Sequence, residues 1–91
     1  MLRIVRTKRF DKNFALCVTR GYDTAAFEEV AELLYTEQPL PPRCKLHKLS
    51  GKFDGCWDCH IKFDWVLIYR YDKKHKSIIF EDTGTHSDLF K

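Results

Sequence analysis

The alternation of apolar and polar residues is clearest between Trp57 and Phe63, where every second side chain is apolar. A period of two predicts a strand with one buried and one exposed face. The predicted buried side carries Trp57, Cys59, Ile61 and Phe63. The predicted exposed side carries Asp58, His60 and Lys62. This strand therefore brings a carboxylate and an imidazole to one surface.

A short apolar run, WVLIY at positions 65–69, follows directly. Its shortness and its aromatic and branched side chains predict a strand that is buried on both faces. Asp64 separates it from the preceding strand, so we expect the two strands to be adjacent and antiparallel. A further strand is predicted over Ser77–Glu81, after a polar hairpin loop, and a short tail over Ser87–Lys91.

The N-terminal part of the chain predicts a short strand and two helices. Leu2–Arg6 is the strand candidate, and Thr7 can cap a helix that extends to about Arg20. Asp23 can cap a second helix, which the prolines at positions 39, 41 and 42 terminate. Apolar residues recur at helical spacing in both: Phe10, Phe14 and Cys17, then Phe27, Val30, Ala31 and Leu34. The order β-α-α-β-β-β predicts an α+β fold, with an antiparallel sheet packed against the two N-terminal helices.

Length and charge narrow the possible functions. Ninety-one residues suit one domain, which we place at residues 1–91. The net charge is only +3, but six Lys and Arg residues lie in residues 1–20 and four in residues 43–52. Two basic segments favour a polyanionic partner. The first ten residues lack the apolar centre of a signal peptide, and no run approaches the roughly 18 apolar residues of a membrane span. We therefore expect a cytoplasmic protein with reduced cysteines.

Five ionisable side chains in the second half of the chain are candidates for catalysis: His47, Asp58, His60, Asp64 and His86. Imidazoles titrate at about pH 6.5, so two of them can act as base and acid at neutral pH. Such a pair can cleave RNA without a metal. One imidazole takes the proton of the ribose 2′-hydroxyl, a cation stabilises the phosphorane, and the other imidazole protonates the leaving oxygen. Each residue also has an ordinary structural explanation, because histidine–carboxylate pairs occur without catalysis.

Two cysteine patterns suggest other kinds of site. Cys56-Trp-Asp-Cys59-His60 matches the CxxCH pattern of c-type haem attachment. We disfavour haem because a strand places Cys59 and His60 on opposite faces. Cys44 and His47, together with the cysteine pair, could instead supply four zinc ligands. Their eight-residue spacer is shorter than the roughly 12–20 residues of common zinc modules, so a zinc-stabilised module is the weaker alternative.

The C-terminal half resembles the YafQ branch of the RelE/ParE toxin superfamily. The resemblance is carried by HKLSG at 47–51, GCWDCHI at 55–61, DWVLIY at 64–69 and TGTHSDLF at 83–90. It implies a RelE-like fold and the toxin of a type II toxin–antitoxin system. Members of this branch are ribosome-dependent endoribonucleases that cut mRNA without a metal or cofactor. A cognate antitoxin holds them inactive.

The resemblance also places these five candidates on the family's active-site positions, but it does not assign the proton transfers, so the following assignment is our own expectation. His86 is expected to be the general acid and His47 or His60 the base. Asp58 and Asp64 are expected to orient imidazoles or ribose. Phe90 falls on an aromatic position that contacts the substrate.

Two positions depart from the family's usual pattern, because Asp82 and Trp57 stand where relatives carry arginine. Asp82 matters more, since it replaces a cation near the scissile phosphate with an anion. Losing one charge-stabilising contact costs about 10²–10³ in rate. Either other cations bind the substrate, or the chain is a weak or inactive toxin-fold module that only binds antitoxin or ribosome. The candidate cations are Arg43, Lys45, Lys48 and Lys62.

Overall fold

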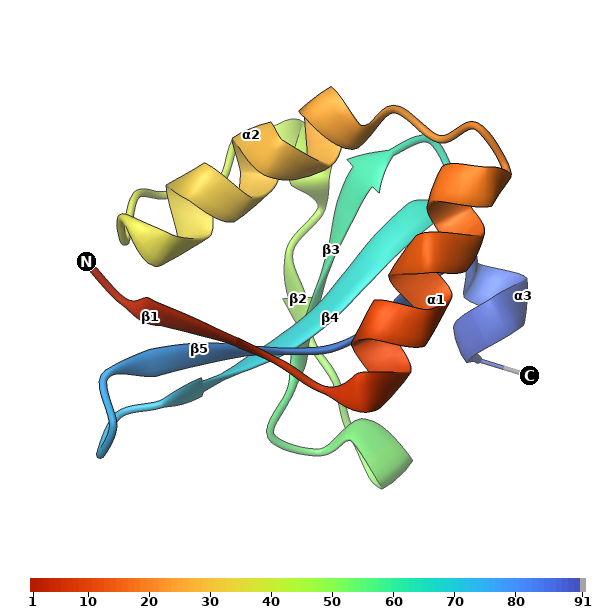
Figure 1. The fold of residues 1–91 in the computed structure, drawn as a ribbon. Helices are drawn as coiled ribbons and strands as arrows, with labels where there is room; N and C mark the ends of the chain where they lie inside the picture. The colour runs from red at the N-terminus through yellow and green to blue at the C-terminus, as the bar shows by residue number, and fades with distance from the viewer. Residues whose placement is uncertain (91) are drawn as a thin grey trace.

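A computed structural model describes residues 1–90, and in them a five-stranded sheet is covered on one face by two helices (Figure 1). The strand order is β1-β5-β4-β3-β2. The strands are β1 (Arg3–Arg6), β2 (His47–Lys48), β3 (Trp57–Lys62), β4 (Trp65–Asp72) and β5 (Ser77–Gly84). The helices are α1 (Lys8–Thr19), α2 (Thr24–Tyr35) and the short α3 (His86–Leu89), with 3-10 turns η1 (Pro42–Cys44) and η2 (Gly51–Phe53).

The predicted α+β class is confirmed, and the structure adds detail at both ends of the sheet. Strands β2 to β5 pair antiparallel, whereas β1 joins β5 in parallel. The basic segment after the prolines supplies the two-residue strand β2, which the sequence pattern did not predict. The predicted tail is partly helical, because Thr85 caps α3. No described helix combines the length and the apolar character needed to cross a membrane.

The predicted caps of the two long helices are confirmed. The Thr7 hydroxyl accepts a hydrogen bond from the Phe10 amide at 3.0 Å and so begins α1. The Asp23 carboxylate accepts from the amides of Ala25 and Ala26 at the start of α2. These side chains satisfy backbone donors that have no partner within a helix.

The main core lies between the helices and the sheet. Phe10 packs against the rings of Phe14, Phe27 and Phe80, with centroids 5.4–5.9 Å apart. The run at positions 65–69 is almost fully buried, as predicted, and the side chains of its residues alternate between two clusters. Trp65, Leu67 and Tyr69 belong to the core under the helices.

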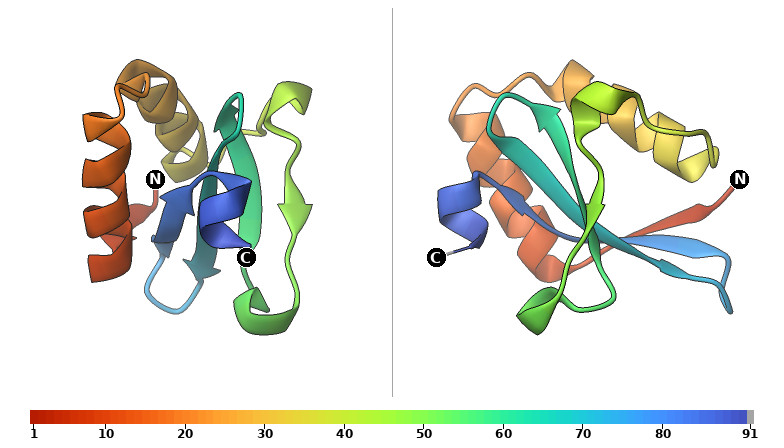
Figure 2. Two further views of the ribbon diagram at one scale, coloured as in Figure 1. Left: turned by 90° about the vertical axis from the view of Figure 1, so that its right-hand side faces the viewer. Right: turned by 180° about the vertical axis from the view of Figure 1, so that it is seen from behind.

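A second, smaller apolar cluster covers part of the opposite face of the sheet. It contains Cys56, Val66, Ile68 and Leu89, with Leu49 and Phe53 packed against it. Leu89 comes from α3 and joins this cluster on the face that α1 and α2 leave open. Figure 2 shows α3 beside the end of the sheet. We call this side of the sheet the open face.

Two details of the predicted alternation in β3 are wrong. Asp58 was expected to be exposed, but it is 1% exposed because β2 and the neighbouring segments cover it. Phe63 was expected on the buried side, but it is 88% exposed because the strand ends at Lys62 and Phe63 occupies the turn. Cys59 and Ile61 are buried under the helices, as predicted.

Candidate active site

Pairing of the strands brings the predicted histidines and carboxylates to the open face. His47 of β2 is the direct cross-strand partner of Asp58 on β3. Asp58 and His60 are two residues apart and therefore point to the same side of β3. Their partners on β4 are Ile68 and Val66, which belong to the apolar cluster of the open face.

Asp58 is a buried carboxylate close to three imidazoles. The Nδ1 atom of His47 lies 2.9 Å from Asp58 Oδ1. His47 Nδ1 is hydrogen-bonded to the Lys45 carbonyl oxygen at 3.2 Å, and within residues 1–90 Asp58 Oδ1 has no hydrogen-bond donor. Burial raises the pKa of Asp58, and the charges of His47, His60 and His86 oppose that effect.

Asp64 and His86 form the second pair. Asp64 lies in the β3–β4 turn, and its Oδ1 accepts from both Nδ1 and the backbone amide of His86. Hydrogen bonding from the His86 side chain lowers the pKa of Asp64, with a further contribution from the amide. The His86 ring is therefore fixed through Nδ1, which leaves Nε2 as the nitrogen free to exchange a proton with a substrate.

His60 and Phe90 complete the cluster around His86. The ring of His60 lies 5.0 Å from that of His86, between centroids, and the Phe90 ring lies 5.8 Å from His86. Phe90 also packs edge-on against Phe53 at 5.8 Å. The structure therefore brings all five predicted catalytic residues and Phe90 to one region of the open face.

The predicted substrate-binding cations divide into two pairs. Arg43 bonds to Glu29 at 2.9 Å, and Lys62 bonds to Asp23 at 3.0 Å, so both are tied to α2. Lys45 and Lys48 are exposed, and no ion-pair partner for either lies within residues 1–90. Lys45 borders an open groove of about 580 Å³ that also includes His60. Lys45 and Lys48 can therefore bind a phosphate without breaking an existing pair.

Asp82, the departure from the family's pattern, is fixed by two hydrogen bonds. It is 7% exposed, and its Oδ1 accepts from Asn13 Nδ2 at 2.7 Å and from the Thr83 amide at 2.8 Å. This carboxylate therefore links β5 to α1 and makes no hydrogen bond to a predicted catalytic residue.

Sequence reasoning missed the ion pair that holds α3 in place. Arg20, at the end of α1, bonds to Asp88 of α3 at 2.7 Å. Asp88 also completes a capping box with Thr85. Together these contacts lower the pKa of Asp88 to about 2, the Arg20 hydrogen bond being the largest cause. The spacing Thr85-x-x-Asp88 was the available signal, since it is the pattern of a capping box.

The zinc and haem alternatives do not agree with the structure. Cys44 and Cys59 are buried in the core under the helices, whereas Cys56 lies in the cluster on the open face and His47 is exposed. No group of three or more His, Cys, Asp or Glu side chains within residues 1–90 is arranged to hold a metal ion. The four residues of the zinc prediction therefore do not meet, and Cys59 is too buried for haem attachment.

Three imidazoles near two carboxylates, on a face with exposed lysines, are the kind of side chains that proton transfer near an anionic substrate requires. A family model described as a bacterial toxin of type II toxin–antitoxin systems, YafQ, matches residues 2–91. The chain therefore belongs to the YafQ family of toxins.

Three similar proteins agree with this assignment. The mRNA interferase toxin YafQ of Escherichia coli K12 is 36% identical over 83 residues, which are 90% of this chain and 88% of that protein. A metal-bound toxin from Helicobacter pylori has 38% identity and a TM-score of 0.92, covering 99% of this chain and 100% of its own. YafQ in the E. coli DinJ–YafQ complex has 34% identity and a TM-score of 0.89, with full coverage of both chains. The RelE-like fold implied by the resemblance is thus confirmed.

Proposed function

We propose that this toxin is a ribosome-dependent mRNA endoribonuclease of the cytoplasm that cuts RNA by acid–base catalysis, without a metal. The main support is the convergence of Asp58, Asp64 and three imidazoles on one face of the sheet. The relatives named mRNA interferases add to it.

In the proposed reaction, His47 or His60 removes the proton of a ribose 2′-hydroxyl. The 2′-oxygen then attacks the adjacent phosphorus, and the bond from phosphorus to the 5′-oxygen breaks. His86 donates a proton from Nε2 to that leaving oxygen, because Asp64 already occupies Nδ1. The products are a 2′,3′-cyclic phosphate and a 5′-hydroxyl. General acid–base catalysis of this kind contributes about 10²–10⁴-fold per group.

Charge at the phosphate is proposed to come from lysines rather than from the arginine that Asp82 replaces. Lys45 and Lys48 are exposed near His47, and Lys62 follows His60 by two residues. Contacts of this kind set affinity and position without reading sequence.

The proposed protein partner is a cognate antitoxin, as in the E. coli DinJ–YafQ complex. An antitoxin segment over the open face would block access to His47, His60 and His86. The basic segments are proposed to contact the ribosome and its mRNA.

The alternative is a toxin-fold module that binds antitoxin or ribosome but does not cut RNA, and Asp82 is the residue that favours it. This alternative predicts no cleavage by the wild-type chain and a gain of cleavage in Asp82→Arg. Our proposal predicts the reverse: cleavage by the wild-type chain, without help from an arginine at position 82.

The test is cleavage of mRNA on programmed ribosomes, with the RNA ends mapped. We expect wild-type protein to produce 2′,3′-cyclic phosphate ends and His86→Ala to be slower by about 10²–10⁴-fold. A 2′-O-methyl group at the scissile ribose should abolish the cut, because the nucleophile is then blocked. His75→Ala is the matched control, since His75 pairs with Asp72 in the β4–β5 hairpin. Intact mRNA with soluble, folded wild-type protein would refute the proposal.

A further inference from the structure

Phe63 is an exposed aromatic residue in a backbone conformation that suits glycine. It is 88% exposed, and its φ is +52°. With Asp64 it forms the two-residue turn between β3 and β4, where the first position commonly carries glycine when its φ is positive. A bulky side chain at positive φ is strained, and strain of this kind gathers at functional sites. Neither burial nor backbone geometry accounts for a phenylalanine here.

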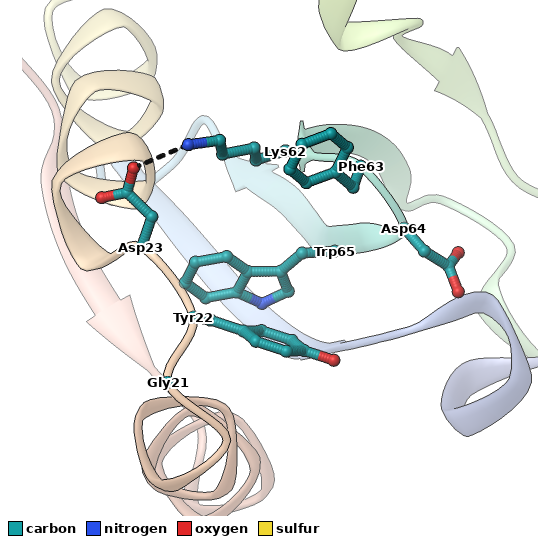
Figure 3. A pocket seen from close by; sticks show the side chains of 7 residues that line it. All are labelled: Gly21, Tyr22, Asp23, Lys62, Phe63, Asp64 and Trp65. Atoms are coloured by element: carbon teal, nitrogen blue, oxygen red, sulfur yellow. Dashed lines mark hydrogen bonds and ion pairs between the residues drawn. The ribbon is translucent and has the colours of Figure 1, made fainter.

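The Phe63 ring forms one wall of a pocket of about 350 Å³ (Figure 3). In the view of Figure 3, Phe63 lies on one side of the Trp65 indole and Tyr22 on the other. Tyr22 and Trp65 pack with their centroids 5.2 Å apart. The pocket is therefore lined largely by aromatic rings, and its volume falls in the range of about 300–1,000 Å³ that suits small ligands. We call it the Phe63 pocket; its lining consists of Gly21, Tyr22, Asp23, Lys62, Phe63, Asp64 and Trp65.

The Phe63 pocket adjoins the candidate active site through a shared residue. Asp64 lines the pocket and also holds His86. On its other side, Phe63 borders the groove that contains His60, Arg43 and Lys45. A ligand in the pocket would thus lie beside Asp64, at the edge of the candidate active site, and be continuous with a groove that Lys45 borders.

We infer that the Phe63 pocket binds a nucleobase of the RNA next to the scissile phosphate, with the base stacked on the Phe63 ring. This inference rests on the proposed function, and it adds a base-binding subsite to it. Aromatic rings hold bases of any sequence by stacking, while nearby cations follow the backbone. Lys45 supplies such a cation, since it borders the groove that Phe63 also lines and no ion-pair partner for it lies within residues 1–90.

An RNA base suits the pocket better than an antitoxin side chain for two structural reasons. The pocket shares Asp64 with the candidate active site, and Phe63 also borders the groove that contains His60. The carboxylates that line it, Asp23 and Asp64, already accept hydrogen bonds from Lys62 and His86, so they do not leave an unpaired negative charge facing the ligand.

The experiment compares three substitutions that distinguish the effect of the Phe63 ring from the effect of the positive φ. Phe63→Gly removes the ring and relieves the positive φ, so this variant should fold at least as stably as wild type. Phe63→Tyr keeps an aromatic face. Glu37→Gly is the matched control, because Glu37 also has a positive φ, +60°, but lies after α2 and outside the pocket.

Two quantities are measured on the full chain. The first is the KM and kcat for mRNA on programmed ribosomes, and the second is the Kd for a fluorescein-labelled oligoribonucleotide blocked by 2′-O-methyl groups. We expect Phe63→Gly to raise both KM and Kd about tenfold with little change in kcat. Phe63→Tyr and Glu37→Gly should stay within about twofold of wild type, consistent with an effect of the ring.

Two results would overturn the inference while leaving the proposed function intact. One is wild-type KM and Kd in Phe63→Gly. The other is unchanged RNA binding together with weaker binding of the antitoxin, which would make the pocket a protein-docking surface. Failure of the wild-type chain to bind or cut RNA would instead defeat the proposed function, and the base-binding subsite with it.

Discussion

The two faces of the sheet are built from alternate residues of the same strands, yet they differ in kind. On the helix-covered face, Cys59, Leu67 and Phe80 join a large core of aromatic and aliphatic side chains. On the open face, the neighbouring residues Asp58 and His60 lie beside a small apolar cluster. Burial of apolar surface is the dominant source of stability, so the helix-covered face holds the fold together. Because the open face contributes less to stability, the fold tolerates the free-energy cost of burying the Asp58 carboxylate there.

The largest expected effect is on the helix-covered face. Phe10→Ala removes a ring that is 2% exposed and packs against three other phenylalanines. We expect unfolding free energy to fall by about 3–5 kcal/mol, because the change leaves a cavity as well as losing buried area. Urea denaturation followed by circular dichroism measures it. Val18→Ala on the same helix is the control, since Val18 is 47% exposed and should change stability by less than about 0.5 kcal/mol.

On the open face, Asp58→Asn should affect activity and stability in opposite directions. Cleavage should fall by about 10²-fold, since the site loses a negative charge close to three imidazoles. Unfolding free energy at neutral pH should rise by on the order of 1 kcal/mol, because a buried charge with no aligned donor is removed.

The raised pKa of Asp58 determines how the difference in stability between Asp58→Asn and wild type changes with pH. The pKa of Asp58 is raised in the folded state, so its ionisation favours unfolding as pH increases through that pKa. The stability advantage of Asp58→Asn should therefore be present at neutral pH and disappear in acid, where the native carboxyl is also neutral. Thermal melts of both proteins across this range measure it. A variant that is less stable than wild type at neutral pH would show that Asp58 contributes to folding.

The smallest expected effect concerns the connection between the two faces. Arg20→Ala breaks the pair with Asp88 that joins α1 to the helix carrying His86. Both side chains are about one-third exposed, so we expect only a small loss of stability. Cleavage should fall severalfold through kcat, because His86 is less well positioned, and Arg20→Lys should restore part of it.

Arg6→Ala is the matched control for this variant. It breaks another exposed pair, between Arg6 of β1 and Asp11 of α1, and neither residue belongs to α3. Equal losses of kcat in Arg20→Ala and Arg6→Ala would mean that α1 acts through general stability rather than through His86.

Much of the fold could be predicted from sequence because its signals are local. The caps at Thr7 and Asp23, and the apolar run at positions 65–69, each depend on a few neighbouring residues. Strand β2 gave no such signal, since two residues are too few to show a period, and only pairing with β3 defines it. The parallel pairing of β1 with β5 likewise depends on distant residues.

The residue types of the candidate site could be predicted from sequence, but the burial of each side chain and its contacts could not. A period of two placed Asp58 and His60 on one face, but their different burial arises from β2, whose position depends on tertiary structure. The partner of Asp82 could not be predicted either, because Asn13 is 69 residues away in the chain. The exposure of Phe63 follows from the end of β3, and strand ends are poorly marked in sequence.

The parallel pairing of β1 with β5 also has a consequence for the order of folding. The Thr7 hydroxyl donates to the Glu81 carbonyl across 74 positions, whereas β3, β4 and β5 are joined by short turns. Contacts between distant residues close slowly, because the intervening chain must lose entropy before they form. We therefore expect the β3–β4–β5 meander to form first and β1 to dock last. Until then one edge of β5 is unpaired, and the folding chain is open to association with other strands.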